Sequence, residues 1–122
     1  MNKKKNITLV LTTINKASRN ILNIEKECKK KNWEFQIVGD YKTPKKFKLV
    51  YGKFCSFSDQ KKLKFSYSKR TPKNNYARKN IGYLLSIKNK AEIIIETDDD
   101  NYPLKKFFKN RELIKKFILI KN

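Results

Sequence analysis

The chain of 122 residues contains no histidine, two cysteines, three glycines and three prolines. Cys28 and Cys55 stand far apart, form no CxxC pair and have no histidine to join them, so we expect reduced structural thiols. No stretch reaches the roughly 18 consecutive apolar residues that span a bilayer, and the lysine-rich start is followed by too short an apolar segment for a secretory signal. We therefore expect no membrane span and a cytoplasmic location.

Acidic residues are scarce: 11 Asp and Glu stand against 31 Lys and Arg, which gives a formal net charge of +20. Only four of the cationic residues are arginines. Grooves that bind nucleic acid favour arginine for its bidentate contacts, whereas lysine spread along a whole chain is typical of a solvated coat. Two interpretations stay open, a solvated lysine surface and a functional surface for a polyanion.

The length and a hydrophobic content of 39% are sufficient for one core, so we expect a single domain over residues 1–122. The nearly continuous β-branched run at residues 6–15 predicts a strand buried on both faces of a parallel sheet. A helix capped by Ser18 and a strand at residues 33–38 complete a βαβ unit. Residues 53–57 predict a short third strand, and the following segment a turn with one helical turn.

A second helix is expected within residues 72–90, with Asn74 or Asn75 as its cap, and to precede a buried strand at residues 91–97. Its predicted buried face consists of Ala77, Ile81, Leu84, Leu85 and the Lys88 stem. Gly82 is expected to let this helix approach a neighbour closely. The pattern as a whole predicts an α/β fold, a Rossmann-like and mostly parallel sheet with flanking helices.

Three consecutive aspartates, residues 98–100, follow that last strand. Ligands of open α/β sheets bind at the carboxyl ends of the strands. Because side chains alternate along an extended chain, Asp98 and Asp100, more than Asp99, are predicted to hold Mg²⁺ or Mn²⁺, which accept one or two carboxylates together with phosphate oxygens. The alternative is an acidic turn whose aspartates cap the next segment.

Other polar side chains stand where the first two strands end and where the second helix begins: Thr12, Thr13, Asn15, Asp40, Arg78 and Asn80. Asp40 is placed to accept a hydrogen bond from a base or a ribose. Arg78 is placed to neutralise a phosphate through its planar fork of donors. Their common place at one edge of a parallel sheet favours a shared site.

Four segments, VLTTIN, VGDYKTP, NNYARKNIGYL and IIIETDDDNYP, resemble in the same order the segments of STELLO-type glycosyltransferase domains. DDDNYP is also similar to the aspartate motif of the reversibly glycosylated polypeptides, the UDP-arabinopyranose mutase group. Both resemblances imply a GT-A-like fold that binds a nucleotide-sugar donor, most plainly a UDP-sugar. They further imply nucleoside contacts from Thr12, Thr13 and Asp40, a diphosphate side organised by Arg78 and Asn80, and a metal ion on Asp98 and Asp100.

A GT-A enzyme normally continues well beyond its aspartate motif, whereas 22 residues follow Asp100 here. We therefore expect the nucleotide-sugar-binding half of a transferase that lacks most of the acceptor-binding half. A homo-oligomer or an acceptor-domain partner chain would complete it, and no catalytic residue is identifiable. Two alternatives remain, a basic nucleic-acid-binding module, indicated by the aromatics among lysines in KKLKFSYSKR, and a catalytically inactive scaffold of the same fold.

Overall fold

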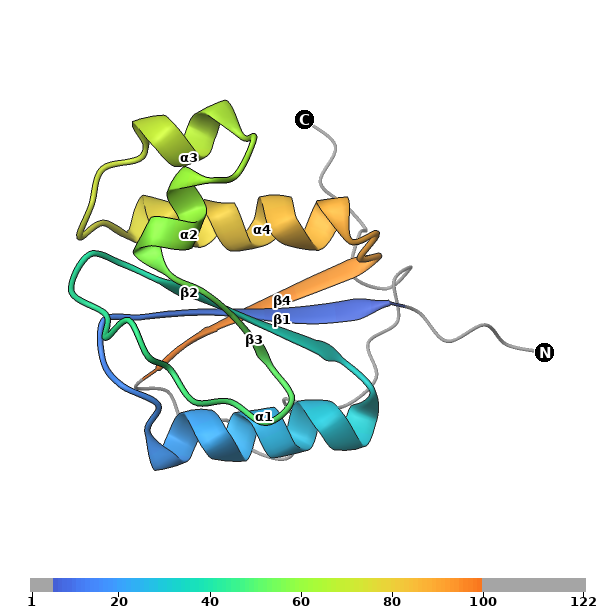
Figure 1. Cartoon of the computed structure of the whole chain (residues 1–122). Helices are drawn as coiled ribbons and strands as arrows, with labels where there is room; N and C mark the ends of the chain where they lie inside the picture. The colour runs from blue at the N-terminus through green and yellow to red at the C-terminus, as the bar shows by residue number, and fades with distance from the viewer. Residues whose placement is uncertain (1–5, 100–122) are drawn as a thin grey trace.

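The computed structural model of the protein describes residues 6–99. These residues form a four-stranded sheet in the order β3-β2-β1-β4, in which every neighbouring pair is parallel. The strands are β1 (Ile7–Thr13), β2 (Glu34–Gly39), β3 (Lys53–Cys55) and β4 (Ile93–Asp98). The helix α1 (Arg19–Lys31) covers one face, and α2 (Phe57–Lys61), α3 (Ser66–Arg70) and α4 (Lys79–Lys88) lie on the other (Figure 1). The predicted Rossmann-like α/β fold is confirmed.

The central strand β1 is buried on both faces, as its continuous apolar sequence predicts. Alternation along the strand sends Leu9 and Leu11 to the core beneath α1, where they join Ile21 and Ile24 of that helix. Val10 turns to the opposite face and meets α4. Full burial of side chains of this size contributes about 1.5–3 kcal/mol each, so the two layers of apolar contact hold both helices against the sheet.

The helix α1 begins and ends with local signals that the sequence carries. The Ser18 side chain accepts a hydrogen bond from the Ile21 backbone N–H at 3.2 Å, which satisfies one of the unpaired donors of the first turn. Asn32 closes the helix with a left-handed conformation, φ 63°, that asparagine tolerates better than most residues. The chain then returns at once into β2, which completes the predicted βαβ unit.

The helix α4 differs from the sequence prediction in both its start and its buried face. It begins at Lys79, after a single 3-10 turn over Tyr76–Arg78, and Asn75 caps that turn by accepting from the Ala77 N–H at 2.8 Å. Its buried residues are Ile81, Gly82 and Ser86, whereas the predicted leucines are only half-buried. Ile81 packs as predicted, but the closest contact with the sheet lies at Gly82, where no side chain fits, and so the buried face is centred on Gly82 and not on the leucines.

Gly82 makes the close approach that was expected of it. A Cβ at this position would lie 2.4 Å from Val10 Cγ1 and 3.0 Å from Val38 Cγ2. Since apolar carbons normally pack about 3.5–4.0 Å apart, no side chain fits between α4 and the strands β1 and β2. The helix therefore lies directly on the sheet and brings its first turn to the edge where the strands end.

Residues 57–71 form two short helices instead of the one helical turn that the sequence predicts. Ser56 and Asp59 make a reciprocal capping box at the start of α2. Gln60 is fully buried, and its Nε2 donates to the carbonyl oxygens of Gly39 at 2.6 Å and of Cys55 at 3.1 Å. This amide joins α2 to the ends of β2 and β3. Its bond to Gly39 spans 21 residues, so no local sequence pattern predicts it.

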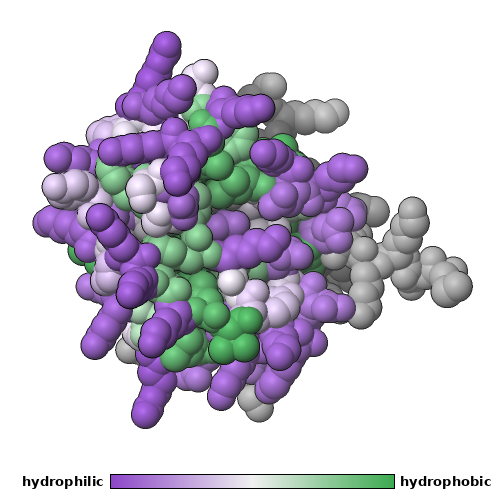
Figure 2. All heavy atoms as spheres, viewed as in Figure 1, coloured by the Kyte–Doolittle hydropathy of each residue, from purple (hydrophilic) through white to green (hydrophobic). Residues whose placement is uncertain are grey.

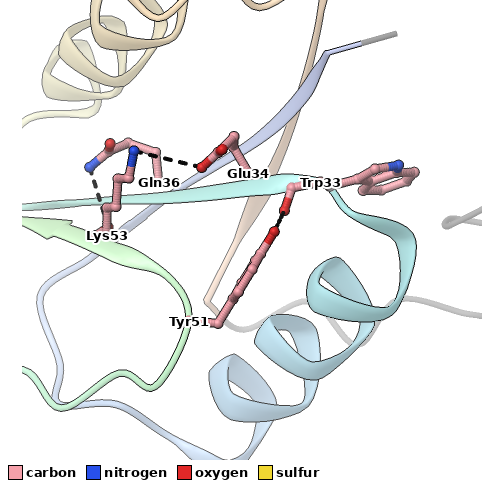
Figure 3. Close-up of polar contacts among 5 residues, drawn as sticks. All are labelled: Trp33, Glu34, Gln36, Tyr51 and Lys53. Carbon is pink, nitrogen blue, oxygen red and sulfur yellow. Dashed lines mark hydrogen bonds and ion pairs between the residues drawn. The ribbon is translucent and has the colours of Figure 1, made fainter. Parts of the chain in front are cut away.

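The edge strand β3 is attached to β2 by side chains as well as by its short backbone ladder (Figure 3). Gln36 Nε2 donates to the Lys53 carbonyl oxygen at 3.3 Å, and the Lys53 ammonium lies 3.7 Å from the Glu34 carboxylate. Just before β3, the Tyr51 hydroxyl donates to the Trp33 carbonyl oxygen at 2.7 Å. These contacts fix the long connection that leaves the end of β2.

Hydrophilic residues cover most of the face shown in Figure 2, with smaller hydrophobic areas between them. Over residues 6–99, no helix has both the length and the apolar character that a bilayer crossing requires. The single-domain assignment for residues 1–122 and the cytoplasmic location stay predictions.

Candidate functional site

A cavity of about 480 Å³ opens at the carboxyl ends of β1, β2 and β4, within the size range of small-molecule sites. It lies at the edge where the chain leaves β1 for the start of α1, toward the left of Figure 1. Its lining consists of Thr12, Thr13, Ile14, Asn15, Val38, Gly39, Asp40, Lys42, Asn74, Asn75, Arg78, Asp98 and Asp99. Six of the predicted site residues therefore meet here, namely Thr12, Thr13, Asn15, Asp40, Arg78 and Asp98.

The end of β1 is bonded to the segment that follows β4. The Thr13 hydroxyl donates to Asp99 Oδ2 at 2.6 Å, and the Asn15 amide donates to the same oxygen at 3.0 Å. Asn20 donates to the Asp99 carbonyl oxygen at 3.0 Å from the first turn of α1. Asp99, which was predicted to be less important for metal binding than its neighbours, is thus held by three side chains and lines the cavity.

Asp40 is buried at the end of β2 and acts as a backbone acceptor. Its Oδ1 accepts from the N–H groups of Tyr41 at 2.6 Å and Asn74 at 2.7 Å, and its Oδ2 accepts from the Asn75 N–H at 3.1 Å. The carboxylate therefore ties β2 to the loop before α4, where Asn74 has a φ of 54°. The predicted contact with a base or ribose stays a prediction, and Oδ2, with its single bond from the described residues, is the oxygen available for it.

Arg78 lines the cavity and is almost fully buried, and its guanidinium is already extensively bonded. Its Nε donates to Gln60 Oε1 and its Nη1 to the Thr71 carbonyl oxygen, both at 2.8 Å, and the group lies 4.6 Å from the centre of the Phe57 ring. Burial lowers the pKa of Arg78, and the nearby Asp40 carboxylate acts in the opposite direction. Its donors thus hold the α2 wall of the site, and the predicted phosphate contact stays a prediction that depends on the remaining Nη hydrogens.

Asp98 ends β4 and lines the cavity beside Asp99. Its Oδ1 lies 2.7 Å from the Lys79 ammonium, and the two side chains are 44% and 13% exposed. Asp100, its predicted partner in binding a metal ion, lies outside the described residues. Within residues 6–99 no group of three or more His, Cys, Asp or Glu side chains is arranged to hold a metal ion.

The carboxylate oxygens of Asp98 and Asp99 supply part of the ligand set that a hard divalent cation requires. Hydrogen bonds within residues 6–99 use Oδ1 of Asp98 and Oδ2 of Asp99, which leaves the other oxygen of each carboxylate without a donor from that part of the chain. Mg²⁺ and Mn²⁺ accept oxygen ligands and commonly take one or two carboxylates, the rest being water and phosphate oxygens. Two carboxylates on one cavity wall meet that requirement, and the Lys79 ammonium competes for one of them.

Asn80 does not join the other predicted site residues. It is exposed, is absent from the cavity lining, and donates to the Tyr67 hydroxyl at 2.8 Å. Conversely, Lys42, Asn74 and Asn75 line the cavity although no site role was predicted for them. Asn74 or Asn75 was predicted as a helix cap, and Asn75 does cap the 3-10 turn before α4. The backbone N–H groups of both asparagines also donate to Asp40, and the bond from Asn74 spans 34 residues.

An α/β sheet with its polar cavity at the carboxyl edge is the arrangement by which many nucleotide-binding domains hold their ligands. No known protein family matches the chain, and no solved structure does. Two proteins of Arabidopsis thaliana are similar to part of it: "Probable glycosyltransferase STELLO2" is 32% identical over 69 residues, and "Probable glycosyltransferase STELLO1" is 31% identical over 69 residues. This weak similarity supports a glycosyltransferase-like relationship.

The match to each of these proteins covers 57% of this chain and 9% of the relative. The chain thus corresponds to a small part of the curated proteins it resembles. The resemblance to the UDP-arabinopyranose mutase group stays a prediction.

Proposed function

We propose that the cavity binds the diphosphate and nucleoside of a nucleotide sugar, most plainly a UDP-sugar, in a glycosyltransferase-like reaction that depends on Mg²⁺ or Mn²⁺. The observation that carries the proposal is the meeting of Asp98 and Asp99 with Thr12 and Asp40 around one cavity at the carboxyl edge of a parallel sheet. The partial similarity to two glycosyltransferases supports the choice of ligand class.

The side chains divide naturally into a nucleoside end and a diphosphate end. Thr12 and Asp40 lie at the neighbouring ends of β1 and β2, where the hydroxyl and the second carboxylate oxygen face a base or ribose. Asp98 and Asp99 stand on the other side of β1 and would hold the cation, with Asp100 as the further predicted ligand. Arg78 also lines the cavity and keeps the α2 segment in place through Gln60.

The bound cation would supply Lewis-acid stabilisation of the negative charge on the departing nucleoside diphosphate. The chain's own residues hold the metal-binding carboxylates in position. Asp99 is fixed by Thr13 and Asn15, so its free oxygen has a defined direction before any ligand arrives. Such fixed placement avoids a reorganisation cost at the moment of binding.

Calorimetry with UDP and Mn²⁺ tests the proposal directly. We expect Asp98→Asn to abolish metal-dependent UDP binding, because it removes a charged oxygen ligand from the cavity wall. Glu96→Gln is a matched control, since it removes the same charge two residues earlier on an exposed position of β4. If Asp98→Asn and Asp100→Asn both bind as the parent does while Asp99→Asn does not, the predicted pair of metal ligands is wrong.

Thermal unfolding gives a second reading of the same site. Saturation at 100 times the dissociation constant stabilises a folded protein by about 2.7 kcal/mol, which corresponds to a rise of several degrees for a domain of this size. We expect the rise with UDP plus Mn²⁺ and its absence when EDTA is present. An unchanged melting temperature at saturating UDP plus Mn²⁺ would refute the donor site, and an equal rise in EDTA would remove the metal from it.

Nucleic-acid binding remains a second candidate function because one observation favours it. Residues 41–91 contain 15 lysines and arginines but a single carboxylate, Asp59, so the positive charge is concentrated after β2. Cations also lie over aromatic rings there, with Lys73 4.4 Å from the centre of Tyr41 and Lys61 5.0 Å from that of Phe57. Single-stranded nucleic acid is bound by such combinations of charge and stacking.

Salt dependence separates the two functions. A nucleic-acid surface loses affinity steeply as salt rises, since binding releases counterions, and it does not respond to Mn²⁺ or UDP. If the chain binds single-stranded RNA in that way and is indifferent to UDP with Mn²⁺, the nucleic-acid function replaces the nucleotide-sugar function.

A further inference from the structure

Lys79 and Asp98 form an ion pair unlike the others in the described part of the chain. Its N–O distance is 2.7 Å, and the Lys79 side chain is 13% exposed. The pairs Lys30–Glu27 and Lys53–Glu34 are 3.6 and 3.7 Å long, and every side chain in them is at least 40% exposed. Exposed pairs of that kind contribute little to stability, whereas a short and partly buried pair fixes the position of both groups.

The position of this pair relates it to the cavity. Lys79 is the first residue of α4 and Asp98 the last of β4, so both stand at the edge of the sheet where the cavity opens. Asp98 is among the residues that line the cavity and Lys79 is not, so the pair connects the cavity wall to the first turn of α4. Gly82 lets α4 lie close enough to the sheet for this contact, because the helix meets β1 without an intervening side chain.

We infer that Lys79 is a diphosphate-binding residue whose ammonium is paired with Asp98 until the ligand binds. The inference rests on the proposed function and deepens it. In the unliganded protein the ammonium neutralises Asp98, so a divalent cation that arrives alone has to compete with a positive charge already in place. A ligand that brings a diphosphate offers the ammonium a new anionic partner next to Asp98, and the carboxylate then becomes available to the metal.

The chemistry of lysine suits such an exchange better than that of arginine. An ammonium is a compact charge with three donors on a flexible four-carbon stem, so it can change partners by rotation about its own bonds. Arg78, the adjacent cation, is fixed instead by Gln60 and Thr71. The two residues thus have different tasks, Arg78 in holding the wall and Lys79 in responding to the ligand.

The consequence is coupling between the metal and the nucleotide. Each binds weakly alone and strongly in the presence of the other, because only the two together satisfy Lys79 and Asp98 at the same time. Coupling between two ligands commonly amounts to a factor of about 5 to 150. By the reciprocity of binding equilibria, UDP strengthens Mn²⁺ binding by the same factor by which Mn²⁺ strengthens UDP binding.

The test is the substitution Lys79→Met in the full chain, which keeps the stem and removes the charge. Mn²⁺ binding is followed by electron paramagnetic resonance with Mn²⁺ alone, and UDP binding by calorimetry at saturating Mn²⁺. We expect Mn²⁺ alone to bind about tenfold more tightly than in the parent and UDP to bind about tenfold more weakly. Lys88→Met, at the exposed end of the same helix, is the control and changes neither affinity.

The remaining outcomes are distinct. If the parent shows coupled binding of Mn²⁺ and UDP and Lys79→Met leaves both affinities unchanged with its fold intact by circular dichroism, this inference fails and the proposed function stands. If neither the parent nor the variant binds Mn²⁺ or UDP, both fail. Lys79→Arg separates charge from mobility: it keeps the charge with a rigid fork, so a variant that matches the parent in both affinities would overturn the exchange of partners.

Discussion

Gly82→Ala is expected to destabilise the protein, although glycine-to-alanine changes inside helices normally stabilise. Alanine is more favourable than glycine in a helix by about 1 kcal/mol, which is the gain available here. Against it stands the clash: the new Cβ would lie 2.4 Å from Val10 Cγ1, more than 1 Å inside a normal contact. Val10 and Val38 are both fully buried and cannot withdraw, so α4 has to move away from the sheet.

Overpacking of a core costs about 1–3 kcal/mol, and a clash with two buried branched side chains belongs at the upper end of that range. After subtraction of the helix gain, the expected net loss is about 2 kcal/mol, or roughly 8 °C in melting temperature. Urea unfolding followed by the fluorescence of Trp33 measures it well, because this single tryptophan is buried beside the core. The circular dichroism signal at the same urea concentrations checks that the transition is cooperative.

A double-mutant cycle with Val10→Ala isolates the clash. Shortening Val10 removes both of its Cγ atoms, so Gly82→Ala should cost at least about 1 kcal/mol less in that background, a coupling typical of residues in contact. If Gly82→Ala is as stable as the parent or more so, the helix accommodates a Cβ without leaving the sheet and the reasoning is refuted.

Three further outcomes are expected. Asp40→Asn weakens the acceptor of three backbone N–H groups and should lower the free energy of unfolding by about 1–3 kcal/mol, with Glu96→Gln as an exposed control; an unchanged urea midpoint would contradict this. Gln60→Leu leaves two carbonyl oxygens and the Arg78 guanidinium without their partner, so we expect a larger loss of about 3 kcal/mol or more, and a smaller one for Gln60→Glu, which keeps the acceptor. Burial raises the pKa of Cys28 to about 12 and that of Cys55 to about 11, so both thiols should resist iodoacetamide at pH 8.5 in the native protein and react after unfolding. Labelling of the native protein at the rate of the unfolded chain would show that the thiols are accessible. Because the unfolded chain releases these thiol protons at lower pH than the folded one, the free energy of unfolding falls as pH rises from about 9 toward 11.

The strands and α1 were predictable because their signals are local. A strand covered on both faces has to be apolar throughout, and β1 reads that way in the sequence. The strand at β4 was also expected, but its full burial was not correct: it lies at the edge of the sheet, with Ile95 and Thr97 buried and Glu96 exposed. Ser18 and Asn32 lie next to the helix they close, so its ends are also visible in a short window. The location of the site follows from the fold class, since a parallel sheet brings the carboxyl ends of all its strands to one edge.

The inner arrangement of the site was not predictable, because its contacts connect residues far apart in the chain. Gln60 stands in a lysine-rich segment and looks like a surface residue, yet it is fully buried and satisfies three partners. The bond from Arg78 to Gln60 was not predictable either, because it joins residues 18 positions apart, and the predicted phosphate contact of Arg78 stays a prediction. The pairing of Lys79 with Asp98 likewise depends on how closely α4 lies on the sheet, which one glycine determines.

The strand order has a consequence for how the site comes into being as the chain folds. β1 and β2 pair across a connection of one helix, whereas β1 and β4 join residues 86 positions apart, such as Ile7 and Ile93. The entropy lost in closing a loop rises with its length, and long-range pairing slows folding. The β1–β2 half, with Thr12 and Asp40, can therefore be structured before Asp98 and Asp99 arrive, which makes the acidic half of the cavity the later one to form.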